Sequence, residues 1–309
     1  MTVQGLEDIE CPFCHRPGYR VLEEGGWFAE KCPECRLVFL SPRPTANETV
    51  RLYSDDEAHH SASSHLADYG SPASRLETAR TLRLIREHTP RGRLLELGPG
   101  SGALLAEAQR QGYDVESVEL NPAQVQFIRD VLRLPCSESL DAVDGTFDVV
   151  YHRDVLSHFS DPIAVFRALH HRLKPGGVHI FETGNGDFHP RFAKLFASFQ
   201  FPDHLFFFSG RSLELLLAET GFRKVSIHRY ALTAELSFTR LINRVRRTAV
   251  PPGLAAPTGL PGHPAAVGPL RLLVPLMEYV RYGLRYWVGR LAPKLGRPQT
   301  MIVVAVKPE

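Results

Sequence analysis

The chain has 309 residues, of which 43% are hydrophobic and 23% charged, and it carries a net charge of +2. This composition excludes disordered, collagen-like and coiled-coil chains, and the length suits one large domain with appendages or two domains. No apolar run reaches the roughly 18–20 residues that cross a bilayer, and residues 1–10 lack the apolar stretch of a signal peptide, so we expect a cytoplasmic protein.

The charge is distributed unevenly along the chain. Residues 240–309 contain 11 Lys and Arg against 2 Asp and Glu, a surplus of +9, whereas residues 1–239 have a balance of −7. A basic segment of this kind can contact a membrane surface, a nucleic acid or an anionic substrate. It can equally be the solvated face of a helix.

Four of the five cysteines form two Cys-x-x-Cys pairs separated by 17 residues, Cys11 with Cys14 and Cys32 with Cys35. This spacing predicts a tetrahedral four-thiolate Zn²⁺ site, and we assign residues 1–45 to a zinc-binding module. Two disulfides would use the same cysteines, but a cytoplasmic chain keeps its thiols reduced. The haem-attachment pattern Cys11–His15 would require export and would leave the second pair unexplained. Because four thiolates leave no open coordination position, we expect a structural ion.

Residues 46–90 are predicted to form a helical or lid segment. We expect a short helix at 47–53, a mobile Ser- and His-rich stretch at 54–74, and an amphipathic helix at 75–88.

Strand and helix signals then alternate over residues 91–240. The predicted strands are Arg93–Leu97, Val115–Leu120, Phe147–Tyr151, Val178–Thr183 and Lys224–Tyr230, with a last strand at Thr300–Val306. The predicted helices are Ala103–Gln111, Ala123–Val131, Pro162–Arg172 and Arg211–Thr220. This alternation predicts an α/β fold with a largely parallel sheet and right-handed crossovers.

Residues 241–309 depart from this alternation. The Pro- and Gly-rich stretch 249–268 is expected to be a loop or tether, and residues 269–291 are expected to form a basic, amphipathic helix. Such a helix can make peripheral contact with a membrane, although it can also simply cover the domain.

A glycine-rich turn, Gly98-Pro99-Gly100-Ser101-Gly102, follows a predicted strand and opens a predicted helix. Glycines let the backbone approach a ligand closely, and the helix N-terminus adds favourable dipoles. Glu119 ends the next strand, where a carboxylate can accept both hydroxyls of a ribose. The pattern therefore predicts a nucleoside site. Gly98, Gly100 and Ala103 also fit the dinucleotide fingerprint, which is weak on its own.

Further motifs favour one family over a dehydrogenase. These motifs are Glu96-x-Gly98-x-Gly100-x-Gly102, Glu119, Phe147-Asp148-Val149-Val150, Val155-Leu156-x-His158 and Leu173-Lys174-Pro175-Gly176-Gly177. Together they resemble the class I S-adenosylmethionine-dependent methyltransferases over about 91–230 and the last strand. The resemblance implies a Rossmann-like sheet with helices on both faces. The cysteine pairs followed by Leu37–Pro44 resemble a subgroup with an N-terminal zinc-ribbon-like module, whose members are small-molecule enzymes of sugar, polysaccharide or natural-product pathways.

The resemblance also implies which residues bind S-adenosyl-L-methionine. They are Glu96 near the methionine amino group, Gly98, Gly100, Ser101 and Gly102 in the loop, Glu119 and Leu120 at the ribose, Glu138 at the adenine, and the backbone of His152 on the methionine side.

Holding the accepting atom, the methyl group and the sulfur in line gives most of the acceleration of methyl transfer. The reaction also benefits from a general base with a near-neutral pKa, and histidine is the side chain that has one. The candidates are His204 and His158, with Asp203 or Asp154 to orient an imidazole. Either histidine can instead have a packing role.

We therefore expect methyl transfer to the O, C or N atom of a small molecule such as a sugar, polysaccharide precursor or natural product. One alternative is an RNA methyltransferase, but residues 1–90 are not strongly basic and nucleic acid is an unlikely partner. The other alternative is a non-catalytic cofactor-binding or assembly module.

Overall fold

The computed structural model describes residues 5–54, 69, 71–249 and 274–309. Most of the expected mobile stretch at 54–74, the expected loop at 250–268 and the start of the expected helix at 269–291 lie outside these residues. No helix in the described ranges has the length and hydrophobicity to cross a membrane.

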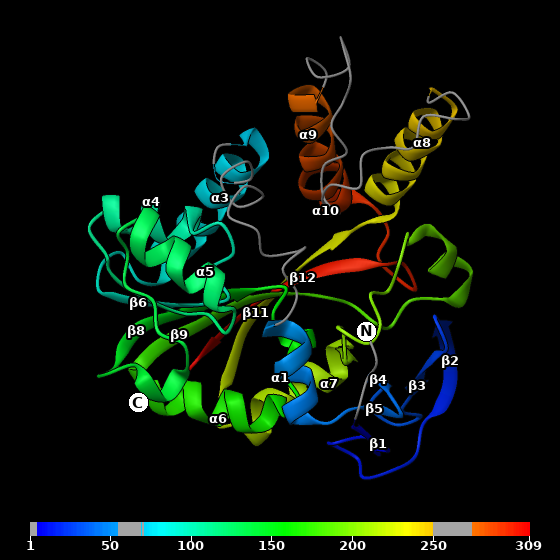
Figure 1. The fold of residues 1–309 in the computed structure, drawn as a ribbon, viewed down its shortest axis with the longest axis horizontal. Coiled ribbons are helices and arrows are strands. Elements are labelled where there is room, and N and C mark those ends of the chain that lie inside the picture. The colour runs from blue at the N-terminus through cyan, green and yellow to red at the C-terminus, as the bar shows by residue number, and fades with distance from the viewer. Residues whose placement is uncertain (1–4, 55–68, 70, 250–273) are drawn as a thin grey trace.

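A six-stranded mixed sheet forms the centre of the molecule (Figure 1). Its strands, in spatial order, are β11 (Arg223–Ala231), β12 (Gln299–Val306), β9 (Leu173–Gly184), β8 (Phe147–Arg153), β6 (Arg93–Leu97) and β7 (Asp114–Val118). Strands β9, β8, β6 and β7 are parallel, and β12 is antiparallel to both of its neighbours. The predicted α/β fold is confirmed. The carboxyl ends of the parallel strands meet at one edge, where open α/β sheets bind their ligands.

Alternate side chains of the strands enter two hydrophobic cores, so that Leu94 and Leu95 of β6 face opposite sides. The helices α3 (Pro72–His88), α4 (Ala103–Arg110) and α5 (Pro122–Gln126) cover one side, and α6 (Pro162–Arg172) and α7 (Gly210–Glu219) cover the other (Figure 1). Short 3₁₀ or π segments are η1 (Phe127–Val131), η2 (Leu140–Ala142), η3 (Leu156–His158) and η4 (Pro190–Leu195).

Three of these helices begin in the same way. Ser71, Asn121 and Asp161 each accept a hydrogen bond from a backbone N–H in the first turn, and each is followed by proline. The polar side chain satisfies a donor that the helix leaves free, and proline has the backbone angle that the first helical position needs. Local sequence therefore sets where α3, α5 and α6 begin.

A second sheet contains the cysteine segment and a strand from far along the chain. Its strands are β2 (Tyr19–Glu24), β3 (Trp27–Lys31), β4 (Val38–Leu40) and β10 (Phe206–Phe207), while β1 (Leu6–Glu7) pairs with β5 (Arg43–Pro44). Strand β10 pairs with β4 in the order β10-β4-β3-β2. Buried side chains from both parts, including Phe39 and Phe166, belong to one hydrophobic core. The cysteine segment is therefore packed against the α6 and α7 side of the domain.

The remaining helices are one that follows the cysteine segment and several from the C-terminal part of the chain. They are α1 (Ala46–Ser54), α8 (Thr233–Ala249), α9 (Val274–Gly283), the π segment η6 (Leu284–Val288) and α10 (Gly289–Leu291). Helix α8 was not predicted from the sequence, although its apolar residues recur on one side of the helix.

Candidate functional site

The turn between β6 and α4 has the backbone shape that its glycines allow. Gly98, Gly100 and Gly102 all have positive φ angles, of 60°, 55° and 71°. A Cβ atom on Gly98 would lie 2.6 Å from the Cγ2 atom of Val155, so the loop is also tightly packed there. Gly102 caps α4 without a side-chain hydrogen bond. The N-terminal N–H groups of α4 therefore remain available to a ligand.

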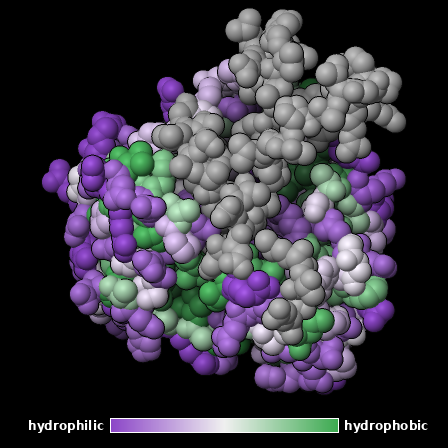
Figure 2. Space-filling model, in the orientation of Figure 1, coloured by the Kyte–Doolittle hydropathy of each residue, from purple (hydrophilic) through white to green (hydrophobic). Residues whose placement is uncertain are grey.

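A cavity of about 530 Å³ lies beside this turn. Its walls include Gly98 and Gly100 of the turn, Glu119 and Leu120 after β7, and His158 of η3. The ends of β6, β7 and β8 thus bring five predicted site residues to one cavity. Figure 2 shows hydrophobic surface in the part of the molecule where α1, α5 and α6 approach one another.

Glu119 is 3% exposed, and its Oε1 atom accepts the backbone N–H of Asn121 at 2.9 Å. Asn121 in turn caps α5 through its side chain. The start of α5 therefore holds the Glu119 carboxylate in the cavity wall.

Glu96 lies beneath the turn and is fully buried. Its Oε2 atom has no hydrogen-bond partner among the residues that the structure describes. Burial raises the pKa of Glu96 to about 8, although the charge of Arg153 opposes this shift. A buried carboxyl group without a partner is costly, so this position favours a ligand that brings a positive charge or a donor.

Arg153 ends β8 and lines the same cavity. It pairs with Glu77 of α3, and Glu77 also lies 3.9 Å from Arg285 of η6. The side-chain role of Arg153 was missed from the sequence, because its partner is distant in the chain.

Besides Glu96, four other predicted cofactor residues have no atoms in the cavity wall. Glu138 is exposed and lies 3.6 Å from Arg129, and Leu140 lines the cavity in its place. His152 is fully buried among aromatic rings, with the ring of Phe181 stacked at 5.2 Å, and burial lowers its pKa to about 3. The side chain at this position of β8 points into the α6 core. Ser101 and Gly102 belong to the glycine turn but do not line the cavity.

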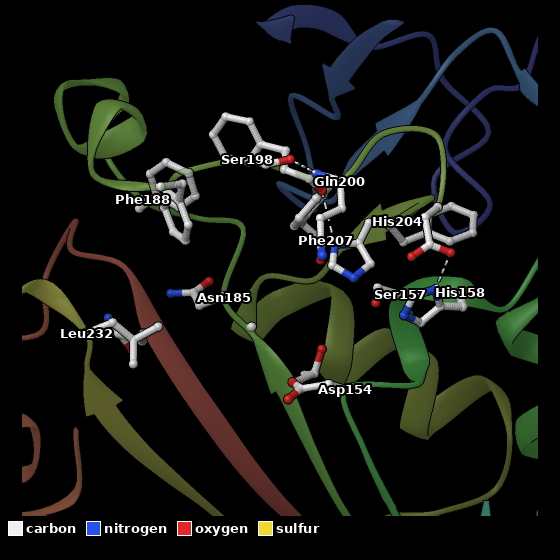
Figure 3. A pocket seen from close by; sticks show the side chains of 17 residues that line it. Asp154, Ser157, His158, Asn185, Phe188, Ser198, Gln200, His204, Phe207 and Leu232 are labelled. Carbon is white, nitrogen blue, oxygen red and sulfur yellow. Dashed lines mark hydrogen bonds and ion pairs between the residues drawn. The ribbon is translucent and has the colours of Figure 1, made fainter. Parts of the chain in front are cut away.

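A second cavity, of about 510 Å³, adjoins the first and shares with it Asp154, His158 and Asp203. In Figure 3, His158 and His204 lie on one side of this cavity and Leu232 and Asn185 on the other, with Asp154 between them. Phenylalanines 188, 196, 199, 206 and 207 supply much of the remaining wall. The second cavity is therefore apolar with a few convergent polar groups, which is typical of a small-molecule site.

The two histidines have different environments. The Nδ1–H of His158 donates to Oδ1 of Asp203 at 3.1 Å, and the Nδ1–H of His204 donates to the carbonyl of Phe199 at 3.1 Å. Burial opposes protonation of His158, but Asp203 and Asp154 outweigh it and raise the pKa of His158. Burial, helped by the charge of His158, lowers the pKa of His204 to about 4. The ring centroids are 4.7 Å apart, and one polar atom each of His158, Asp203 and His204 lie within 4.8 Å of one another.

The four paired cysteines also converge. Their Sγ atoms all lie within 4.8 Å of one another, and those of Cys11 and Cys35 are 3.4 Å apart. Both pairs form the same kind of turn. The N–H of His15 donates to the carbonyl of Cys11, and the N–H of Arg36 donates to the carbonyl of Cys32. These two residues, His15 and Arg36, have positive φ angles of 50° and 63°. The two turns therefore present their thiols to one point.

The cysteine segment also supports the second cavity. The Glu24 carboxylate accepts the N–H groups of Phe199 and Phe201, at 3.0 Å and 3.3 Å. Asp187, just beyond β9, pairs with Lys31 and Arg36. These contacts hold the segment between β9 and β10, which forms one wall of the cavity.

Two further parts of the site were missed from the sequence. Thr49 and Val50 of α1 line the first cavity, and Asn185 and Phe188 line the second. Neither Thr49 and Val50 nor Asn185 and Phe188 belong to a recognisable sequence motif. Only the position of the second pair, just after a parallel strand, could have indicated a ligand site.

Comparisons with known proteins agree with this geometry. Residues 71–227, half of the chain, match a family model described as a methyltransferase domain. The chain is 28% identical over 164 residues to a ubiquinone biosynthesis O-methyltransferase of Xanthomonas campestris pv. campestris (strain B100), covering 47% of this chain and 67% of the relative.

Two solved structures share the fold. Phospholethanolamine N-methyltransferase 2 of Haemonchus contortus, in complex with phosphomonomethylethanolamine and S-adenosylhomocysteine, has a TM-score of 0.51 at 17% identity, covering 94% of this chain and 71% of that chain. The 1,6-didemethyltoxoflavin-N1-methyltransferase of Burkholderia thailandensis, with bound 1,6-didemethyltoxoflavin and S-adenosylhomocysteine, has a TM-score of 0.50 at 16% identity, covering 94% and 99%.

The crowding at Gly98 gives a direct test of the loop. Gly98→Ala should lower the free energy of unfolding by about 1–3 kcal/mol more than Gly100→Ala, because only the first substitution meets Val155. Both glycines have similar positive φ angles, so backbone strain is matched. Urea unfolding measures the difference, and equal losses would show that the Val155 contact does not constrain the loop.

Proposed function

Because this chain belongs to the methyltransferase-domain family, we propose that its β6–α4 loop and Glu119 bind S-adenosylmethionine and that a small molecule in the second cavity accepts the methyl group. The protein is an S-adenosylmethionine-dependent methyltransferase. The observation that carries the proposal is the junction of the two cavities at Asp154, His158 and Asp203. Methyl transfer needs the donor and the accepting atom in line, and adjoining cavities meet that need.

The residues around the first cavity fit this cofactor. The unpartnered Oε2 atom of Glu96 suits the methionine ammonium group, reached through the loop or a water molecule. Glu119 would accept the ribose hydroxyls, and the turn at Gly98 and Gly100 leaves the backbone open to close approach. Bound there, S-adenosylmethionine supplies a methyl group on a positively charged sulfur.

His158 is our choice for the general base. It lines both cavities, and because its Nδ1–H donates to Asp203, Nε2 is the basic nitrogen of the neutral ring and would accept the proton of a substrate hydroxyl. A raised pKa brings it toward the range in which a base works best. His204 lines only the second cavity, and its low pKa keeps it neutral, so we assign it to holding the acceptor through Nε2.

The acceptor is proposed to be an apolar small molecule that carries a hydroxyl group. The phenylalanine wall favours a ring or an aliphatic body, and the two imidazoles face the polar part. One relative is named an O-methyltransferase, which favours oxygen as the accepting atom. A cavity of about 510 Å³ has the size of small-ligand sites, which favours such a molecule over RNA.

We also propose that Cys11, Cys14, Cys32 and Cys35 bind one structural Zn²⁺. A tetrahedral ion with Zn–S bonds of about 2.3 Å needs thiolates about 3.8 Å apart, close to the spacing of this cluster. Three of the four cysteines are fully buried, and four thiolates leave no position for a substrate. The ion would then stabilise the segment that supports the acceptor cavity.

Replacing Glu119 tests the cofactor site. Glu119→Ala should weaken binding of S-adenosylhomocysteine at least tenfold, because one lost hydrogen bond to a charged group costs about 1.5 kcal/mol. Isothermal titration calorimetry measures the affinity, and thermal melting checks that the variant is folded. Glu138→Ala is the control, since Glu138 is exposed and outside the cavity. Unchanged affinity in a folded Glu119→Ala variant would exclude the assignment.

Replacing Asp203 tests the base. Its charge raises the pKa of His158, so Asp203→Asn should move the rising limb of the kcat/KM–pH profile to lower pH and lower its plateau. Asp144→Asn, at the opposite end of the sheet beside Arg93, should leave the limb in place. A limb that does not move in Asp203→Asn would remove His158 as the base.

Removing the metal tests the cysteine site. We expect one zinc per chain by elemental analysis, lost in Cys14→Ser and retained in Cys136→Ser, which lies outside the cluster. Loss of zinc should raise KM for the acceptor more than it weakens S-adenosylhomocysteine binding, because Glu24 anchors the acceptor wall. Protein that is metal-free when purified under reducing conditions would contradict the proposal.

A further inference from the structure

The helix formed by α9, η6 and α10 turns Arg285 and Tyr286 toward the protein and exposes several large apolar residues. Arg285 pairs with Glu235 of α8 at 2.7 Å, and Tyr286, 4% exposed, packs under Arg80 of α3. The outward positions are Leu276, Trp287, Leu291 and, just beyond α10, Leu295, with exposed fractions of 59%, 72%, 87% and 98%. Such an arrangement leaves a row of large apolar side chains without a covering element among the described residues.

A basic cavity of about 450 Å³ lies beside this row, between α3, β11 and α10. Arg83, Arg290 and Lys294 line it, and none of the three forms an ion pair with a carboxylate in the described ranges. Arg80 in the wall is already paired with Glu182, and Glu87 is the one carboxylate in the lining. No lining residue of this cavity lines either of the other two. The cavity is therefore separate from the other two, and its lining carries a surplus of positive charge.

The apolar row and the basic cavity meet at the end of α10. Leu291 directly follows Arg290, and Leu295 directly follows Lys294, whose Nζ atom donates to the carbonyl of Arg290 at 2.8 Å. This edge therefore presents exposed leucines next to unpaired cations.

We propose that this edge is a peripheral membrane-binding surface for anionic phospholipid. The basic cavity takes the lipid phosphate, and Trp287, Leu291 and Leu295 enter the boundary between headgroups and acyl chains. Arg83, Arg290 and Lys294 complement an anionic surface, and they favour a membrane over a protein partner that would need matching acidic residues. The proposal does not depend on methyl transfer, because it uses neither of the other cavities.

Vesicle co-sedimentation of the full chain tests this surface. The protein should pellet with vesicles of phosphatidylcholine and phosphatidylglycerol, remain in solution with phosphatidylcholine alone, and be released by salt. Arg290→Glu/Lys294→Glu should lower the partition coefficient by roughly thirtyfold, since each basic residue near an anionic membrane contributes about a fivefold effect. Trp287→Ser/Leu291→Ser should also lower it, and this loss should persist at higher salt.

Two matched variants control for charge and hydrophobicity. Arg211→Glu/Arg223→Glu makes the same charge change at exposed positions remote from the cavity, and Leu6→Ser/Val131→Ser removes apolar side chains that are 53% and 54% exposed. Both should bind vesicles like the wild type, and all variants should keep the wild-type melting temperature.

Three outcomes would overturn the proposal. The first is equal binding of wild type and Arg290→Glu/Lys294→Glu to anionic vesicles. The second is thermal stabilisation by inorganic phosphate that depends on Arg290 and Lys294, without any vesicle binding, which would make the cavity a free-phosphate site. The third is a dimer, seen by sedimentation equilibrium, that Trp287→Ser/Leu291→Ser dissociates, which would assign the apolar row to a second copy of this chain.

Discussion

The parallel pairing of β6 with both β7 and β8 brings the ends of three strands to a single edge of the sheet. Gly98 follows β6, Glu119 follows β7, and Asp154 follows β8, so a change of register in either pairing would move one of these residues along the edge. Both cavities depend on this alignment, because the junction between them lies where β8 ends. The remaining parts of the site are added to this edge by α1, by the segment after β9 and by the helices that follow the sheet.

A series of ion pairs connects the first cavity to the C-terminal helices. Arg153 at the cavity pairs with Glu77, Glu77 approaches Arg285, and Arg285 pairs with Glu235. Glu235 is 3% exposed, so removing its arginine partners would leave a buried carboxylate uncompensated, which costs about 3–5 kcal/mol. Helices α3, α8 and α9 therefore keep their positions relative to one another through groups that also border the ligand. This explains why a region that differs from the repeating α/β pattern is still integral to the fold.

The sequence alone was informative where local rules decide structure. The predicted helix start at Pro162 is confirmed, and the glycine turn after β6 was identifiable because few other residues accept positive φ angles. Helix α3 begins at Pro72, three residues before its predicted start, because residues 54–74 were assigned to a mobile stretch. Prediction from the sequence failed where packing between distant segments determines the direction of a side chain. Strand β8 is buried on both faces, so its pattern did not reveal that His152 points into the α6 core while Arg153 reaches the cavity. Nor did any local signal indicate that α1 would line the first cavity.

The pairing of β4 with β10 joins residues 38–40 to residues 206–207. During synthesis the ribosome delivers these strands far apart in time, so β4 is an open sheet edge until residue 207 has left the exit tunnel. An open edge is a template for pairing with other chains. The N-terminal sheet, although begun first, is thus completed only after about two thirds of the chain has been made, and the protection of its β4 edge from aggregation depends on the prompt arrival of β10 rather than on its own sequence.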